Sequence, residues 1–305
     1  MKKMLKILAI ILLVVVGIAV LFVLRGVLTP AVPKNYTQTV KTGGALEAKY
    51  LQNGEHAVKY FEAPVLENYK KYEIWYPEEL ESSSCQYPVI VVNNGTGIKG
   101  SKAKAMFEHF ASWGFIVIGN EEEYSWNGFA SYMSLNYLLK CNGSSESIFY
   151  QKVDTDNIGA IGHSQGGVGA INTVTNTKHQ DMYKTVVAES PANPELAAGL
   201  EWDYDLTKVK IPIFFVAGTE GDFEMKTVIP AEQLPLMYEA VDAPKAMARK
   251  TGCDHGQMLY SADGYVTAWL LWQLQGNEEA ASVFIGENPE LLNNKLYQEQ
   301  RIDCP

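Results

Sequence analysis

The chain has 305 residues, of which 47% are hydrophobic, 11% aromatic and 20% charged. This composition is typical of a folded protein, and the length is sufficient for a full hydrophobic core. The formal net charge is −10. Because an acidic surface repels a phosphate backbone, the charge argues against nucleic acid as a partner.

The chain begins with an apolar segment suited to a membrane. Residues 7–24 are apolar without interruption, and three lysines precede them. The segment is about long enough to cross a bilayer, and the lysines favour a cytoplasmic N-terminus. We therefore expect residues 1–26 to form a signal-anchor or a cleaved signal peptide. Either one puts the body outside the cytoplasm, at the cell membrane or secreted.

Residues 27–44 contain Pro30, Pro33 and a pair of glycines, and we expect them to tether this segment to a folded body over residues 45–305. In the body, segments with the apolar periodicity of a strand alternate with segments that have the periodicity of a helix. In chain order, strands are expected at 57–61, 72–76, 88–93, 115–119, 157–161, 185–188, 211–217 and 246–249, and helices at 101–112, 128–139, 168–175, 230–241 and 263–275. The first two strands suggest an antiparallel hairpin. The alternation of strands and helices after this hairpin predicts an α/β protein with a mostly parallel, doubly wound, eight-stranded sheet and helices on both faces.

Four cysteines are present, and an exported protein can join them in disulfides. Cys85 precedes a predicted strand and Cys141 ends a helix that precedes another strand, so both are expected at one edge of the sheet. We therefore expect a Cys85–Cys141 pair, which leaves Cys253 with Cys304. Four free thiols are the alternative.

The segment from 157 to 167 is the most informative part of the chain. A short apolar strand leads into Gly162-His163-Ser164-Gln165-Gly166, and a helix is expected directly afterwards. Gly-x-Ser-x-Gly between a strand and a helix is the pattern of a nucleophile elbow, in which a strained turn exposes the serine. Small neighbours are required there, which the two glycines provide. The pattern predicts Ser164 as a catalytic nucleophile.

A serine nucleophile needs a base and a carboxylate to orient that base. The buried strand expected at 211–217 runs into a turn with Asp222, which we favour as the carboxylate, with Glu220 and Glu224 as alternatives. His255 lies in a glycine-flanked loop after the last predicted strand and is the candidate base. The order Ser, acid, His is that of α/β-hydrolases.

Other features complete this hypothesis. The oxyanion hole requires two backbone N–H groups, which we assign to Gln165 and to Thr96, in a loop of small residues after an earlier strand. His163 is expected to point away from the serine hydroxyl. Trp126, Trp202 and Tyr204 are candidates for a substrate pocket, although packing explains them equally well. The segment 189–210 is too short for a lid domain, so the site should be open and suit bulky substrates. No cofactor is implied, and no metal-ligand spacing occurs in the sequence.

The sequence Asp-Asn-Ile-Gly-Ala-Ile-Gly-His-Ser-Gln-Gly-Gly at 156–167 resembles the elbow of cutinase-like polyester hydrolases and related bacterial lipases, in the α/β-hydrolase (dienelactone-hydrolase-like) superfamily. Further similarity lies at 111–118 and 284–289. The resemblance implies an α/β-hydrolase catalytic domain over 45–305. The chain departs from the family at the substrate platform, where Thr96, Gln165 and Ala192 stand in place of an aromatic residue, a methionine and a tryptophan. The family's cysteine near Gly286 is also missing.

The sequence thus predicts a serine carboxylic ester hydrolase that forms an acyl-enzyme at Ser164, with His255 and Asp222, and acts on bulky or lipid-like esters. An acyltransferase or peptidase on the same triad is one alternative. A catalytically inactive surface-binding module is another.

Overall fold

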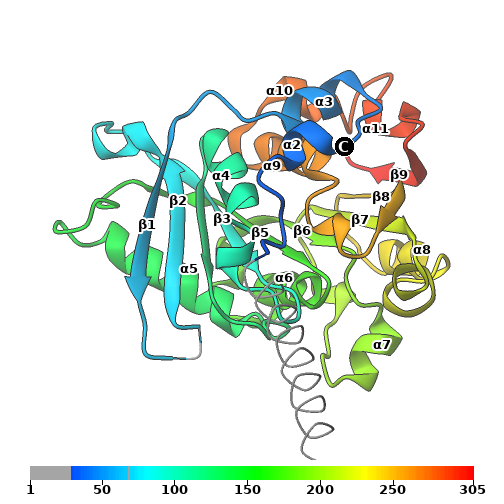
Figure 1. The fold of residues 1–305 in the computed structure, drawn as a ribbon, viewed down its shortest axis with the longest axis horizontal. Coiled ribbons are helices and arrows are strands. Elements are labelled where there is room, and N and C mark those ends of the chain that lie inside the picture. Colours follow the sequence, from blue (N-terminus) through cyan, green and yellow to red (C-terminus); the bar gives the residue numbers. More distant parts are fainter. Residues whose placement is uncertain (1–28, 68) are drawn as a thin grey trace, which may run out of the picture.

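The computed structural model describes residues 29–67 and 69–305, so the apolar segment at 7–24 lies outside the described residues. In the part that is described, no helix is long and apolar enough to cross a membrane. The centre of the fold is one nine-stranded sheet of order β1-β2-β4-β3-β5-β6-β7-β8-β9 (Figure 1). Its strands are β1 (Val58–Pro64), β2 (Lys71–Pro77), β3 (Tyr87–Asn93), β4 (Ile116–Asn120), β5 (Val153–His163), β6 (Tyr183–Glu189), β7 (Ile213–Glu220), β8 (Lys245–Asp254) and β9 (Tyr297–Asp303).

The six central strands, from β4 to β8 in sheet order, run parallel, whereas β1, β2 and β9 pair antiparallel at the edges. All residues of β3 are buried, as expected for a strand covered on both faces. The ninth strand corrects the prediction of eight. Most residues of β9 are polar and exposed or half-buried, so the strand has no apolar run that reveals it in the sequence.

Helices cover both faces of the sheet, as predicted (Figure 1). On one face lie α4 (Lys104–Ser112) and α9 (Asp263–Gln275), whose apolar residues share a core with Val92, Ile161 and Phe214. On the other face lie α5 (Phe129–Asn142), α6 (Gln165–Asn176) and α8 (Gln233–Glu239). Short helices that the sequence did not reveal are α2 (Tyr36–Thr39), α3 (Ala45–Leu51), α7 (Pro194–Gly199), α10 (Glu278–Ala281) and α11 (Glu290–Asn293).

The N-terminal segment from Ala31 onward is part of the folded body, which corrects the predicted tether. Val32 and Tyr36 are each 1% exposed, and the ring of Tyr36 packs edge-on against those of His109 and Tyr260. Figure 1 shows α2 and α3 against the side of the molecule that carries α9. Apolar burial therefore fixes this segment on the core.

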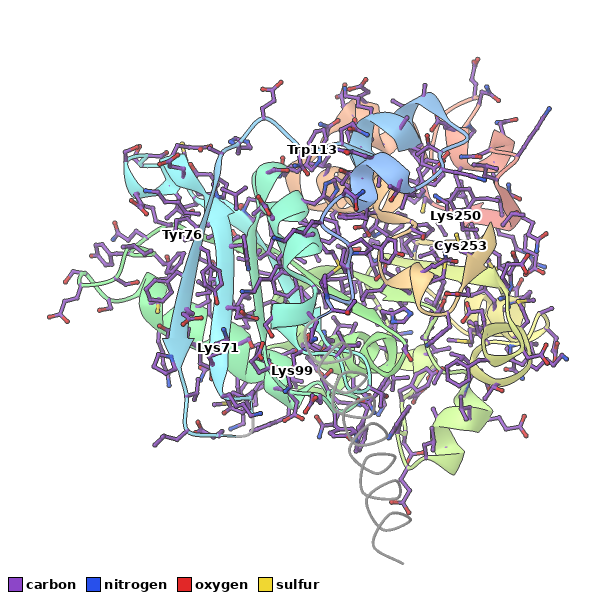
Figure 2. All side chains as sticks on the ribbon, in the orientation of Figure 1. Lys71, Tyr76, Lys99, Trp113, Lys250 and Cys253 are labelled. Carbon is purple, nitrogen blue, oxygen red and sulfur yellow. The ribbon has the colours of Figure 1, made fainter. Side chains whose placement is uncertain are left out.

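An ion pair ties α3 to the sheet as well. Lys250 lies on β8 (Figure 2), and its Nζ is 2.6 Å from Glu47 Oε1 on α3. Both side chains are almost fully buried. Asn294, Tyr297 and the Gly43 N–H also donate hydrogen bonds to Glu47, so this buried carboxylate has four donors.

The four cysteines, all within the described part of the chain, are free thiols, which differs from both predicted pairs. For Cys253 and Cys304 the register of the last two strands gives the reason. Asp303 pairs with Lys245 at the start of β8, whereas Cys253 lies at its far end. Eight residues of extended chain separate these positions by about 26 Å, far beyond the reach of a disulfide.

Candidate active site

The candidate site lies at the edge of the sheet formed by the carboxyl ends of its parallel strands. Ser164 directly follows β5, and His255 directly follows β8. A π-helical turn, η5 (Phe223–Val228), comes shortly after β7 and carries Glu224. Three loops far apart in the sequence therefore meet at one edge, where side chains are free of the sheet's own hydrogen bonds.

The backbone at Ser164 has the strained conformation of an elbow, with φ 60° and ψ −124°. Its N–H donates a 2.8 Å hydrogen bond to the carbonyl of Glu189 at the end of β6. The neighbouring glycines are required sterically. A Cβ on Gly162 would lie 2.0 Å from the Gly166 carbonyl oxygen, and one on Gly166 would lie 2.1 Å from that of Asn93. The strand therefore turns into α6 within a space that admits no side chain.

A continuous hydrogen-bonded series joins three side chains. Ser164 Oγ lies 2.8 Å from His255 Nε2, and His255 Nδ1 lies 2.7 Å from Glu224 Oε2. With Nδ1–H donating to the carboxylate, Nε2 is the nitrogen that accepts from the serine hydroxyl. This arrangement has the geometry of a nucleophile, a base and an orienting acid.

Glu224 is fully buried and has three hydrogen-bond donors. Oε1 accepts from Ser190 Oγ at 2.6 Å and from the Gly218 N–H at 2.7 Å, whereas Oε2 accepts from His255. Burial acts to raise the pKa of Glu224, but the hydrogen bonds from His255, Ser190 and Gly218 outweigh it and hold this pKa below its ordinary value. The carboxylate is therefore charged at neutral pH.

Asp222, which the sequence favoured as the orienting acid, does not contact His255. Its side chain is 83% exposed and forms a 2.9 Å ion pair with Lys226. The next residues form the π-helical turn η5. Side chains two positions apart on a helical turn do not face the same side, so Glu224 points inward and Asp222 lies on the outer side. Glu220 is exposed too. The carboxylate that contacts His255 was thus among the alternatives, but the local pattern of Gly221 and a short carboxylate favoured Asp222.

His163, whose side chain the sequence was expected to direct away from the serine hydroxyl, packs beside His255 in the lining of the pocket. Its ring centroid lies 4.6 Å from that of His255, and its Nε2 donates a 2.7 Å hydrogen bond to the His255 carbonyl. Burial and the proximity of His255 lower the pKa of His163 to about 3. A neutral His163 therefore supports the loop that carries His255.

Thr96 and Gln165, the two residues proposed from the sequence for the oxyanion hole, both lie close to Ser164. Gln165 is the first residue of α6, so its N–H is at the helix N-terminus beside Ser164. Thr96 lines the same pocket as Ser164, and a Cβ on its neighbour Gly95 would lie 3.7 Å from the Ser164 Cβ. The Gln165 side chain is fully buried.

A pocket of about 430 Å³ opens at Ser164 and His255. Leu196 and Leu200 from α7 and its C-cap, Trp202 just beyond, and Phe223 from η5 line it. Phe223 is 58% exposed, and its ring packs edge-on against that of His255 at 5.0 Å. Of the three aromatic residues proposed from the sequence, Trp202 lines the pocket. Trp126 and Tyr204 pack in the cluster behind it.

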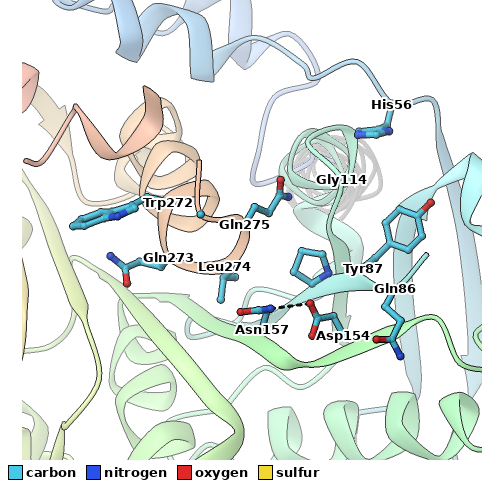
Figure 3. Close-up of a pocket in the computed structure, with 12 residues that line it drawn as sticks. His56, Gln86, Tyr87, Gly114, Asp154, Asn157, Trp272, Gln273, Leu274 and Gln275 are labelled. Carbon is cyan, nitrogen blue, oxygen red and sulfur yellow. Dashed lines mark hydrogen bonds between the residues drawn. The ribbon is translucent and has the colours of Figure 1, made fainter. Parts of the chain in front are cut away.

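Another hollow, of about 640 Å³, lies at the opposite edge of the sheet (Figure 3). It is bordered by Tyr87 at the start of β3, by Asp154 and Asn157 on β5, and by the last turn of α9. Asn157 donates a 2.8 Å hydrogen bond to Asp154, and His56 in this lining pairs with Glu79. These polar groups thus already have hydrogen-bond partners within the protein.

Three consecutive acidic residues, Glu121, Glu122 and Glu123, follow directly after β4. Glu121 accepts hydrogen bonds from the N–H and the hydroxyl of Ser101, at 2.8 and 3.0 Å. Among the described residues, no group of three or more acidic, histidine or cysteine side chains is arranged to hold a metal ion.

Comparison with known families identifies the chain. No curated protein sequence matches it. The profile of the PET hydrolase-like family, however, matches residues 37–305, which is most of the chain and includes every residue of the site described above. The chain therefore belongs to the PET hydrolase-like family and is an ester hydrolase with the α/β-hydrolase fold.

Proposed function

We propose that the chain hydrolyses carboxylic esters through a covalent acyl-enzyme at Ser164. The observation that carries this proposal is the continuous series from Ser164 through His255 to Glu224, with separations of 2.8 and 2.7 Å. Such a series allows the hydroxyl to attack while the imidazole takes its proton, and the buried carboxylate stabilises the charge that develops on the ring.

In the first step Ser164 Oγ bonds to the ester carbonyl carbon and its proton passes to His255 Nε2. The tetrahedral intermediate expels the alcohol, which takes that proton, and an acyl-serine ester remains. Water then bonds to the acyl carbon while one of its protons passes to His255 Nε2. The second tetrahedral intermediate breaks its bond to Ser164 Oγ, which takes that proton back from His255, and the acid is released. The N–H groups of Gln165 and Thr96 are the proposed donors to the oxyanion in both steps.

The proposed substrates are esters with a bulky apolar acyl group. The apolar side chains Leu196, Leu200, Trp202 and Phe223 form part of the wall of the pocket at Ser164, and Leu200 and Phe223 are well exposed. Burial of an alkyl or aryl group against these walls is favourable by about 25 cal/mol per Å².

We further infer that the enzyme acts outside the cytoplasm. The uninterrupted apolar run at 7–24 and the lysines before it support this location. N-terminal sequencing of the exported protein distinguishes a retained anchor from a cleaved signal, and recovery of all activity from the cytoplasm would contradict export.

Replacement of the nucleophile tests the mechanism. In Ser164→Ala, hydrolysis of p-nitrophenyl esters should fall by at least about 10³-fold, because no acyl-enzyme can form. The thermal midpoint should stay close to that of the wild type. A fluorophosphonate probe should label the wild type and not the variant. Retained turnover in the variant, or labelling at another residue, would reject Ser164 as the nucleophile.

A further inference from the structure

We propose that Ser190 is a positioning residue that anchors the carboxylate of Glu224 and so extends the proposed series to four side chains. The inference rests on the proposed function, since an anchor for Glu224 matters to the reaction only where Glu224 orients His255. Nothing in the sequence pattern singles out this serine.

The two oxygens of Glu224 have separate roles. Oε2 faces His255 Nδ1, and Oε1 is held by the hydroxyl of Ser190 at 2.6 Å and by the Gly218 N–H at 2.7 Å. A glutamate has one more rotatable bond than an aspartate, so its carboxylate can turn more freely about its own axis. Two donors on Oε1 fix that rotation and leave Oε2 aimed at the imidazole.

Ser190 is itself held firmly. It directly follows β6, is fully buried, and donates its N–H to the Val216 carbonyl on β7 at 2.7 Å. Its φ of 38° lies in the left-handed region, which a serine adopts at a cost in free energy. The strained conformation is observed together with a hydroxyl that meets the acid, which suggests that the strain serves that contact.

The same turn also supports the nucleophile. The carbonyl of Glu189 accepts the Ser164 N–H at 2.8 Å, and the next side chain, Ser190, bonds Glu224. Two consecutive residues thus contact both ends of the proposed series. The relative placement of Ser164 and Glu224 therefore depends on one short segment after β6.

A hydroxyl that donates to a buried carboxylate favours its charged form. Its removal should make Glu224 more basic and so stabilise the protonated imidazole, which must lose its Nε2 proton before Nε2 can accept from Ser164. Two variants remove the hydroxyl. Ser190→Ala keeps the backbone strain, whereas Ser190→Gly relieves it. Comparison of the two variants therefore distinguishes the effect of losing the hydroxyl from the effect of changing the backbone strain.

The first readout is the pH profile of p-nitrophenyl ester hydrolysis. Both variants should shift the acid limb of kcat/KM upward by about 0.5–1 pH unit, and kcat should fall roughly tenfold with KM nearly unchanged. Ser112→Ala is the matched control. Ser112 is a buried serine at the end of α4 whose hydroxyl donates to the His109 carbonyl. It lies shortly before the start of β4, whereas the candidate site lies at the carboxyl ends of the parallel strands. This control should lower the thermal midpoint and leave the acid limb in place.

The second readout does not need turnover. The proton between His255 Nδ1 and Glu224 should give a downfield NMR resonance that exchanges faster with solvent in both variants than in the wild type. If the fluorophosphonate probe fails to label the wild type, the proposed function fails, and the NMR resonance still tests the anchor. Where Ser190→Ala does not fold, Ser190→Gly decides. The inference is overturned if both resonance and acid limb stay unchanged, or if the glycine variant behaves as wild type.

Discussion

At the scale of single residues, the choice between two carboxylates two positions apart decides the chemistry of the site. Asp222 and Glu224 lie in one loop after β7, but the former pairs with Lys226 in solvent and the latter bonds His255 in the interior. An exposed ion pair contributes little to stability, whereas a buried carboxylate with three donors is held in one orientation.

Isosteric neutral variants distinguish the contributions of the two carboxylates to the reaction. Glu224→Gln should lower kcat by about 10²–10⁴-fold, because the amide keeps the shape but not the charge that stabilises the protonated His255. Asp222→Asn should leave kcat within about twofold of the wild type. Steady-state kinetics on a p-nitrophenyl ester measures both. Equal losses in the two variants would remove Glu224 from the proposed series.

The sequence identified Ser164 and His255 as the residues that the structure brings together, because a nucleophile elbow and a glycine-flanked loop have recognisable patterns. It could not select the acid or place His163. Both depend on side-chain direction, namely a π-helical turn at Phe223–Val228 and a ring that packs against His255. Neither property follows from the spacing of residue types.

At the scale of elements, the strands that were predicted well are the buried ones. Continuous apolar runs indicate β3 and β7, both buried over most of their length. The missed elements β9 and α7 are short and half-exposed, so tertiary contacts rather than local pattern determine them. Yet α7 and its C-cap residue Leu200 form part of the pocket wall, so an element invisible in the sequence shapes the substrate site.

That wall gives a prediction about acyl chain length. Trp202→Ala should reduce kcat/KM for p-nitrophenyl octanoate by about tenfold and for the acetate much less, because only the longer chain reaches the indole and loses buried area. Trp126→Ala is the matched control, since Trp126 packs in the same cluster without lining the pocket. It should lower the thermal midpoint and preserve the preference between the two esters. An unchanged preference in Trp202→Ala would place the acyl group elsewhere.

At the scale of the whole molecule, buried acids connect segments that are far apart in the chain. Tyr36 of α2, Glu189 of β6 and Asp263 of α9 are each at most 1% exposed. Burial raises the pKa of Asp263 to about 8, and burial together with the charge of Asp263 raises that of Glu189 well above its ordinary value. Burial and the charge of Asp263 also raise the pKa of Tyr36. The N-terminal segment, which the sequence suggested as a tether, is thus electrostatically linked to the end of β6, whose Glu189 carbonyl accepts the Ser164 N–H.

This linkage makes the stability of the protein depend on pH. An unfolded chain releases the Asp263 proton near its ordinary pKa of 3.8, whereas the folded protein keeps it up to about pH 8. The folded state therefore binds the extra proton in that window, and its stability decreases as the pH rises through it. Asp263→Asn removes the titration. Relative to the wild type, this variant should gain about 4 kcal/mol in free energy of unfolding between pH 5 and pH 9.

Urea unfolding at a series of pH values measures that difference, with the exposed Asp222→Asn variant as control. The control should follow the wild-type curve throughout, because Asp222 is an exposed residue outside the buried group of Tyr36, Glu189 and Asp263. If Asp263→Asn also runs parallel to the wild type from pH 5 to 9, Asp263 is already ionised in the folded protein. The proton held between α2, β6 and α9 would then have no part in the stability of the fold.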